Sequence, residues 1–316
     1  MTDSWLVYDM LLDIVPEDAL IEELMIGLTW TFCRTQDRVG LAMSPATGCR
    51  TLSWPGTLEG QPARAIATWV KSWDSYQAAV GMAVINASLH QDEELHGRIH
   101  GLRTGGMPNL TVFDYFHARL LNKKVVVVGR YPGLESTLQG VDVTVLEMQP
   151  GMNDLPSAAS EYIIRQADWV FLTASSLTNK TFPRLAELAV DANLVLMGPT
   201  TPLIAEFSEF GVDYLAGTRV RDDIALRRIV MEGGGTRIFD SALEYCLVDL
   251  GVNEMDWIKN AISDTVAKRE KIKSEMETWY ESQRKGRFPG QSQLTQLDIQ
   301  LSSLDSQFKR LWDARH

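Results

Sequence analysis

The stretch KVVVVG at residues 124–129 decides the fold, because it is the first of several short runs rich in β-branched apolar residues. Comparable runs follow, namely VTVLE (143–147), WVFLT (169–173), LVLMG (194–198) and a weaker one, VDYLAG (212–217). Helical stretches such as SAASEYIIRQA and TFPRLAELAVDA lie between them. Apolar strands that alternate with helices are typical of a parallel sheet covered on both faces. We therefore predict an α/β fold with a Rossmann-like, doubly wound parallel sheet in residues 101–252.

Residues 1–100 have the pattern of a small α+β module. The run SWLVYDMLLDIV predicts a short amphipathic helix, and IEELMIGLTWTFCRT followed by VGLAMSP predicts a hairpin. A third β-like run that reaches Trp54 would complete a small meander. Two helices are expected next, in ARAIATWVKSW and SYQAAVGMAVINASL. The polar segment at residues 90–110 that follows them suits a linker or an exposed loop between domains.

The last part of the chain, residues 253–316, carries the clearest periodicity. Apolar residues recur there at steps of three and four, at Leu294, Leu297, Leu301, Leu304, Phe308 and Leu311. The same register occurs upstream at Ile258, Ile262, Thr265, Ile272, Met276 and Trp279, with Arg269 as the charged interruption. The segment GRFPG between the two halves contains residues that end one helix and allow another to begin. We predict an antiparallel helical hairpin with heptad packing.

Composition restricts the partners and the compartment. The chain has 316 residues, 45% of them hydrophobic, and its net charge of −11 repels phosphate backbones, so we expect no nucleic-acid partner. No apolar run approaches the roughly 20 residues that span a bilayer, and the N-terminus lacks a basic signal segment, so we expect a cytoplasmic protein without a membrane partner. The three cysteines, Cys33, Cys49 and Cys246, form no CxxC pair, which favours reduced thiols.

The loops at the carboxyl ends of the predicted strands are rich in Gly, Pro, Ser, Thr and Asn. These loops are GRYPG (129–133), EMQPGMND (147–154), TASSLTNKT (173–181) and GPTTPL (198–203). In an open parallel sheet such loops meet at one edge, where ligands bind. Turns in α/β proteins need Gly and Asn in any case, but four such loops together favour a binding site. The candidate binding residues in them are Gly129, Pro132, Glu147, Thr173, Asn179, Gly198, Thr200 and Thr201.

Glu147 is the most specific of these candidates. It ends the second predicted strand, near the place where nucleotide-binding folds carry the acid that holds a ribose diol. Capping of a neighbouring helix is the alternative role, and the sequence does not decide between these two roles of Glu147. The first loop, Gly129 to Gly133, lacks the G-x-G-x-x-G pattern, and Pro132 removes an N–H that a pyrophosphate would use.

The metal candidates are Glu147, Asp154, His96 and His100. The two histidines stand at i and i+4, a spacing that would place both imidazoles on one face of a helix. Gly97 weakens that helix, and the HExxH glutamate is missing, so solvated linker histidines are the favoured alternative. The sequence contains neither a Walker loop nor a Ser-His-Asp nucleophile elbow.

Several of these motifs, together with the run GMAVINA that contains Asn86, occur in an order that resembles a heavy-metal-chelation family of bacterial and archaeal proteins. The resemblance covers about residues 15–250. It implies an N-terminal domain similar to the enolase N-terminal fold, followed by a Rossmann-like domain. It also implies a cleft in which Asn86 faces the loops around Glu147, Asn179 and Thr200. Tyr131 stands where Phe is common in that family, and the hairpin lies outside the resemblance.

Three functions fit the sequence. The first is the binding or handling of a metal, a metallocofactor or a nucleotide-like small molecule in the interdomain cleft, with the cofactor left open between a metal ion and a metal-bearing small molecule. The second is an accessory or assembly factor that docks on a metalloenzyme, such as a nitrogenase, through residues 253–316. The third is a Rossmann-type transferase that uses Glu147 or Asp154 as a general base. A homo-oligomer is a further expectation.

Overall fold

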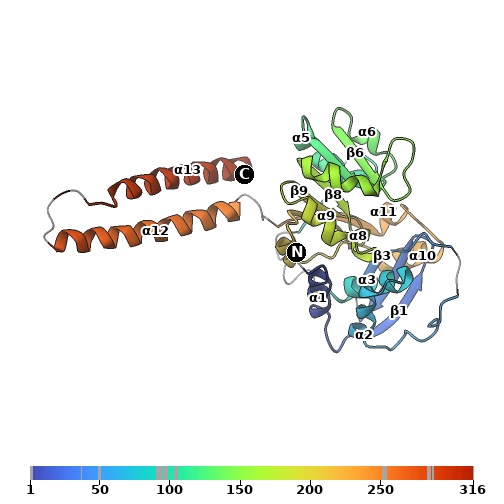
Figure 1. The fold of residues 1–316 in the computed structure, drawn as a ribbon. Coiled ribbons are helices and arrows are strands. Elements are labelled where there is room, and N and C mark those ends of the chain that lie inside the picture. The colour runs from blue at the N-terminus through green and yellow to red at the C-terminus, as the bar shows by residue number, and fades with distance from the viewer. Residues whose placement is uncertain are drawn as a thin grey trace. The chain divides into compact units, whose positions relative to one another are not determined.

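The computed structural model describes residues 3–36, 38–48, 51–89, 95, 99–102, 106–250, 255–282, 286 and 288–315. The chain divides into two compact units, Met1–Leu250 and Gly251–His316. The first unit contains both the small N-terminal module and the parallel sheet, and Figure 1 shows their elements. The predicted domain boundary at residue 100, within this first unit, stays a prediction. None of the helices, where described, has an apolar stretch long enough to cross a membrane.

The large sheet has the order β4-β11-β10-β9-β8-β5-β6-β7. The six strands from β10 to β7 are parallel: β5 (Lys124–Val128), β6 (Asp142–Glu147), β7 (Leu155–Pro156), β8 (Trp169–Thr173), β9 (Asn193–Met197) and β10 (Tyr214–Val220). The chain starts in the middle at β5, moves outward to β7, and returns to the other side of β5 for β8. This reversal confirms the predicted doubly wound α/β fold, and its switch point lies between β5 and β8.

Two antiparallel strands extend the sheet where the sequence pattern did not predict them. β11 (Leu243–Asp249) pairs with β10, and β4 (Ile99–Gly101) pairs with β11. Part of the segment expected to be a linker or loop is therefore a sheet edge. Main-chain hydrogen bonds to β11 explain this, since they pair backbone groups whatever the polarity of the side chains.

Helices flank the parallel sheet and bury its apolar residues. They are α5 (Thr111–Leu120), α6 (Leu134–Thr137), α7 (Ser160–Ile163), α8 (Ser175–Thr178), α9 (Phe182–Leu188) and α11 (Ile238–Ser241). A further helix, α10 (Asp223–Met231), packs through Leu226 and Val230 against Trp30 and Phe32 of the N-terminal module. Short 3-10 turns accompany them: η2 (Pro108–Leu110), η3 (Ser157–Ala159), η4 (Ile164–Gln166) and η5 (Ala205–Phe210). On one face Phe116 of α5 packs against Phe171, Trp169 and Tyr214 of the strands, with ring centroids 5.1 to 5.7 Å apart. These aromatic contacts fix α5 on the sheet.

The N-terminal module consists of α1 (Leu6–Asp13), the antiparallel strands β1 (Ile21–Ile26), β2 (Trp30–Thr35) and β3 (Arg38–Met43), then α2 (Ala63–Ala67), η1 (Thr68–Lys71) and α3 (Ser75–Ser88). The expected meander differs in detail. Its first β-rich run divides into β1 and β2, and no strand forms in the described residues 51–54. α3 is buried along most of its length and packs on β3. A Cβ on Gly40 would lie 2.1 Å from the Ala87 nitrogen, so this close approach requires glycine.

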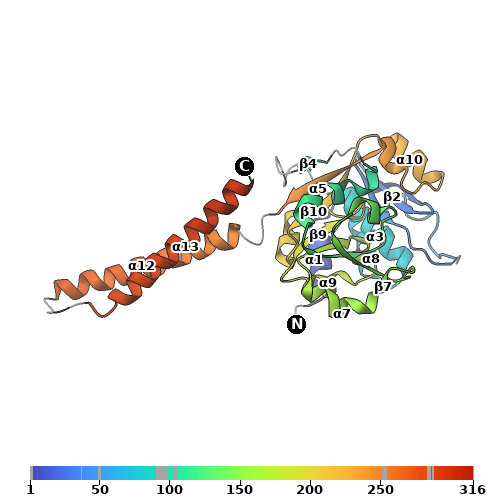
Figure 2. The same ribbon diagram turned by 90° about the horizontal axis from the view of Figure 1, so that it is seen from above.

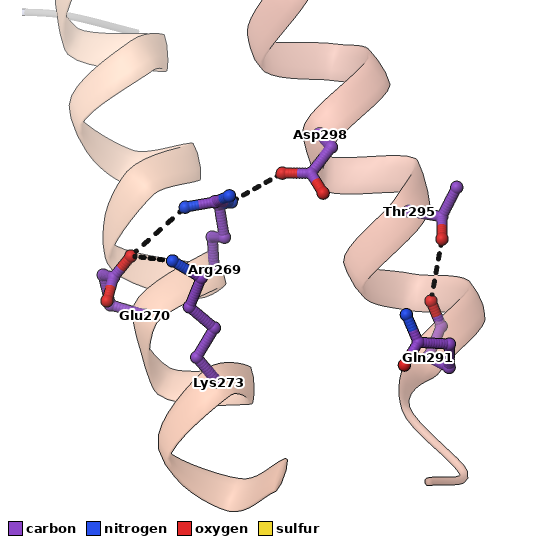
Figure 3. A network of polar contacts seen from close by, with 6 residues as sticks. All are labelled: Arg269, Glu270, Lys273, Gln291, Thr295 and Asp298. Carbon is purple, nitrogen blue, oxygen red and sulfur yellow. Dashed lines mark hydrogen bonds and ion pairs between the residues drawn. The ribbon is translucent and has the colours of Figure 1, made fainter. Parts of the chain in front are cut away.

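The second unit is a pair of long helices, α12 (Met255–Glu281) and α13 (Gln291–Arg315), which run side by side in Figures 1 and 2 and confirm the predicted hairpin. Five of the described heptad positions are buried, namely Ile258, Thr265, Ile272, Leu294 and Leu304, and the other described apolar ones are half-buried. Arg269 lies at a seam position, and its Nε is 2.6 Å from Asp298 Oδ1 on the facing helix, as Figure 3 shows. The Asp298 carboxylate therefore forms an ion pair with Arg269, the charged interruption of the heptad pattern.

Candidate functional site

A cavity of about 640 Å³ opens at the carboxyl edge of the parallel sheet. Its floor is formed by the residues at or just after the ends of β5, β6, β8 and β9, including Gly129, Glu147, Thr173 and Gly198. Trp30 of β2 and Met43 of β3 add a wall from the N-terminal module. The cavity thus lies at the switch point of the sheet, the position where doubly wound folds bind ligands.

The strands reach this edge through tight turns. Gly129 follows β5 with φ +103° and Gly198 follows β9 with φ +108°, a backbone conformation that L side chains rarely adopt. A Cβ on Gly129 would also lie 3.1 Å from Thr173 Cγ2. The glycines therefore keep the two turns open toward the cavity.

Glu147 is half-buried at the end of β6 and lines the cavity. Its Oε1 accepts hydrogen bonds from the backbone nitrogens of Met148 at 2.7 Å and Gln149 at 3.4 Å. Its Oε2 has no hydrogen-bond partner within the described part of the chain. One oxygen of the Glu147 carboxylate therefore stabilises the backbone of the turn that follows β6.

A chain of hydroxyl groups crosses the switch point. Thr173 Oγ1 lies 2.9 Å from Ser175 Oγ, and Tyr131 bonds to the Thr173 side chain from the β5 side. Burial raises the pKa of Tyr131 to about 12, and the nearby charge of Glu147 adds to this effect, whereas the bond to Thr173 opposes it. Tyr131 is therefore a neutral hydroxyl at physiological pH, and it makes a bond that phenylalanine cannot make.

Three cationic side chains line the cavity, and their pairing differs. Arg184 Nε and Nη2 lie 2.8 and 2.5 Å from the two oxygens of Glu161, and its Nη1 lies 2.6 Å from Glu187. Arg130 pairs with Asp154. Lys180 donates from Nζ to the Thr178 carbonyl at 2.8 Å and has no ion pair with any described residue. Burial lowers the pKa of Lys180 to about 8, because the charged ammonium loses hydration.

Asn86 lies behind the cavity wall. Its Nδ2 donates to the Leu41 carbonyl at 2.8 Å and to the Thr200 carbonyl at 2.9 Å, so it joins β3 to the loop after β9. Thr200 Oγ1 in turn accepts from the Met43 nitrogen at 3.0 Å. Asn86 and Thr200 thus hold the N-terminal module against the edge of the sheet, and Thr200 itself lines the cavity. Asn86 is not among the lining residues.

The structure brings together six of the predicted binding residues as cavity lining: Gly129, Glu147, Thr173, Asn179, Gly198 and Thr200. Pro132 and Thr201 do not line the cavity. Asn179 shapes the loop, since its Oδ1 accepts from the nitrogen and the hydroxyl of Thr181 at 3.0 and 2.6 Å.

The predicted metal ligands are not assembled into one site. Asp154 accepts from the Gly151 nitrogen at 2.7 Å and lines a separate hollow, and His100 lies on the edge strand β4. His96 is outside the described residues. Across the described ranges, no three side chains of His, Cys, Asp and Glu gather in a way that could hold an ion. The described cysteines, Cys33 and Cys246, are buried, and burial raises the pKa of Cys33 above its usual range. These residues do not fit a bare heavy-metal ion.

Several lining residues were not predicted. Lys180 and Ser176 lie within the loop that the sequence indicated, but the pattern does not tell which side chains of a loop face a cavity. Trp30 and Met43 belong to strands distant in sequence, and only the packing of the two modules brings them to the cavity. The sequence predicts that Trp30 lies in a β-rich run, but it does not indicate what the side chain packs against.

The fold and the cavity define a class of protein with a small α+β module packed on the carboxyl edge of a Rossmann-like sheet. Residues 8–89 and 111–249 both match the family described as "Putative heavy-metal chelation". The chain belongs to this family, as the resemblance predicted. No protein of curated function matches it.

Two solved structures are similar to the chain. One is a protein of unknown function from the DUF364 family of Desulfitobacterium hafniense DCB-2, with 33% identity and a TM-score of 0.70 over 79% of this chain and 100% of that chain. The other is a protein of unknown function of the same family from Pyrococcus horikoshii, with 19% identity and a TM-score of 0.65 over 77% and 98% of the two chains. At 19% identity, the similarity to the second structure shows a shared fold and nothing more. Residues 253–316 lie outside both family matches.

Proposed function

We propose that the chain binds a nucleotide-like small molecule in the cavity at the carboxyl edge of the sheet. The observation that carries this proposal is the position of Glu147, which ends the second strand of the doubly wound order and keeps one carboxylate oxygen unpaired among the described residues. An acid at this position accepts hydrogen bonds from ribose hydroxyls in nucleotide-binding folds. The cavity volume of about 640 Å³ is within the range of small-molecule sites.

The walls suit the remaining parts of such a molecule. Trp30, Met43 and Tyr131 offer apolar and aromatic surface on which a planar base can pack. Thr173 and Ser175 offer hydroxyl groups at the switch point.

The family's heavy-metal description agrees with this proposal if the metal arrives already bound to a small molecule. Carboxylates, imidazoles and thiolates are the usual protein ligands, and the described residues provide no cluster of them. Neither the family match nor the two similar structures supports the nitrogenase client or the transferase reaction. The protein partner of the hairpin and the homo-oligomer stay predictions.

A binding panel tests the proposal. The full chain is titrated with adenosine, guanosine, cytidine, uridine and their 5′-monophosphates, and heat of binding and thermal shift are recorded. We expect at least one compound to bind and to raise Tm. Glu147→Gln should weaken that binding by about tenfold, the cost of one hydrogen bond to a charged group. The matched control is Glu209→Gln, which changes an exposed carboxylate outside the cavity. Absence of binding throughout the panel would refute the proposal.

A further inference from the structure

Lys180 combines three features that the proposed function does not explain. It lines the cavity, and it adopts φ +66°, in the left-handed region that a residue with a side chain occupies at a cost of about 1 to 2 kcal/mol. Its ammonium is partly buried and has no carboxylate partner in the described residues. Backbone strain of this kind persists where the surrounding structure enforces it, and it is concentrated at functional sites.

The other two cations of the cavity provide the contrast. Arg184 is held by Glu161 and Glu187, and Arg130 is held by Asp154, so neither has a charge left uncompensated. Lys180 has only the neutral carbonyl of Thr178. A buried cation without a counter-charge is costly, and an anionic ligand removes that cost.

Ser176 adds an independent observation at the same loop. It lines the cavity and is 1% exposed, and its Oγ has no hydrogen-bond partner among the residues that the structure describes. Nearly all buried hydroxyl groups are hydrogen-bonded, so an unpartnered one indicates a missing partner. Two nearby backbone nitrogens are already satisfied, because that of Asn179 bonds to the Ser175 carbonyl and that of Thr181 to Asn179 Oδ1.

The loop lies beside the end of β6. Asn179 Nδ2 is 3.6 Å from Met148 Sδ, and Met148 directly follows Glu147. A ligand that reaches Glu147 with its ribose therefore has the Lys180 loop next to it.

We propose that Lys180, with Ser176, binds the phosphate group of the ligand, so that the cavity takes a phosphorylated nucleoside rather than a free nucleoside. This inference rests on the proposed function, which needs only that a nucleoside unit is bound. The ammonium pairs with a phosphate oxygen, and the Ser176 hydroxyl, after a rotation about its side-chain bond, donates to another. Lys180 would replace the Gly-rich phosphate loop that the first turn of this sheet lacks.

The test compares each nucleoside with its own 5′-monophosphate in the full-length protein. The wild type should bind the monophosphate about tenfold or more tightly than the nucleoside, as one charge-assisted hydrogen bond provides. Lys180→Met should reduce this ratio to near one. Lys180→Arg, which keeps the charge, should retain part of the ratio. Lys123→Met is the matched control, because Lys123 lies just before β5 and does not line the cavity.

The outcomes separate the two proposals. Suppose that a nucleoside binds, but its monophosphate binds no more tightly, or the affinity ratio is unchanged in Lys180→Met. Either result overturns the role of Lys180 and leaves the proposed function intact. If no nucleoside and no monophosphate binds, both fail. Lys180→Gly accommodates the left-handed backbone, and it replaces Lys180→Met if that variant does not fold.

Discussion

Replacement of Asn86 by alanine tests how the N-terminal module is fixed to the edge of the sheet. The change removes the two hydrogen bonds from Nδ2 to the Leu41 and Thr200 carbonyls. Each neutral hydrogen bond contributes about 1 kcal/mol, and a buried carbonyl left unpaired costs about 1 to 3 kcal/mol. Asn86 Oδ1 is itself buried without a partner, so its removal returns about 1 kcal/mol. We expect a net loss of about 2 kcal/mol in the free energy of unfolding.

Urea denaturation of the full chain measures this loss, and hydrogen exchange in residues 75–88 assigns it to the first unit. Ser88→Ala is the control on the same helix. Its hydroxyl donates to the Val84 carbonyl one turn back and does not join the two modules, so we expect a loss of about 1 kcal/mol or less, the value of one hydrogen bond. A loss for Asn86→Ala that is no larger than the loss for Ser88→Ala would refute the role of Asn86.

Three further changes have defined outcomes. Lys180→Gly should raise the free energy of unfolding, measured by urea denaturation, by roughly 0.5 to 1 kcal/mol. Glycine removes the cost of the left-handed backbone, and this gain exceeds the added conformational entropy of the unfolded chain. A lower free energy of unfolding in the variant would contradict the backbone strain. The pKa of Lys180 is about 8 in the folded state against 10.5 in the unfolded state, so between these pH values the unfolded state binds more protons. The free energy of unfolding should therefore rise with pH across that window, and it should rise less in Lys180→Met. Parallel curves of stability against pH for the two proteins would exclude this. Gly40→Ala should cost about 3 kcal/mol or abolish folding, because its Cβ meets the backbone of α3; a thermal midpoint like that of the wild type would disprove this packing.

The hairpin gives one more prediction, in the same kind of experiment. Arg269→Leu should leave hydrogen exchange in residues 255–282 unchanged or slower, since an apolar side chain at a seam position replaces a partly exposed ion pair of small net value. Faster exchange in this variant would show that the pair with Asp298 stabilises the hairpin.

The parallel strands and the hairpin could be predicted because their signals are local. Strands such as β5 and β8 are nearly all apolar, and the heptad positions of α12 and α13 repeat along the chain. β4 could not be predicted, because a three-residue strand at an edge is defined by its hydrogen bonds to β11 and not by its own side chains. β11 carries an apolar run, LEYCLVD, but its antiparallel pairing with β10 is set by tertiary structure, since α10 and α11 separate the two strands along the chain.

The same distinction applies to the site. The loops at the strand ends were predictable from topology, and six predicted residues line one cavity. The role of Asn86 in joining β3 to the loop after β9 could not be predicted. A buried amide can face a ligand or the backbone equally well, and only tertiary packing decides between them. Lys180 was missed for a similar reason, since its left-handed backbone and its lack of a carboxylate partner in the described residues have no signature in the sequence.

A crystal structure of the full chain grown with a nucleoside monophosphate from the panel tests the central claim most directly. We predict density for the compound in the cavity between β5 and β8, with the ribose at Glu147 and the phosphate at Lys180. An empty cavity in crystals that contain the compound, or a compound bound elsewhere on the protein, would contradict it.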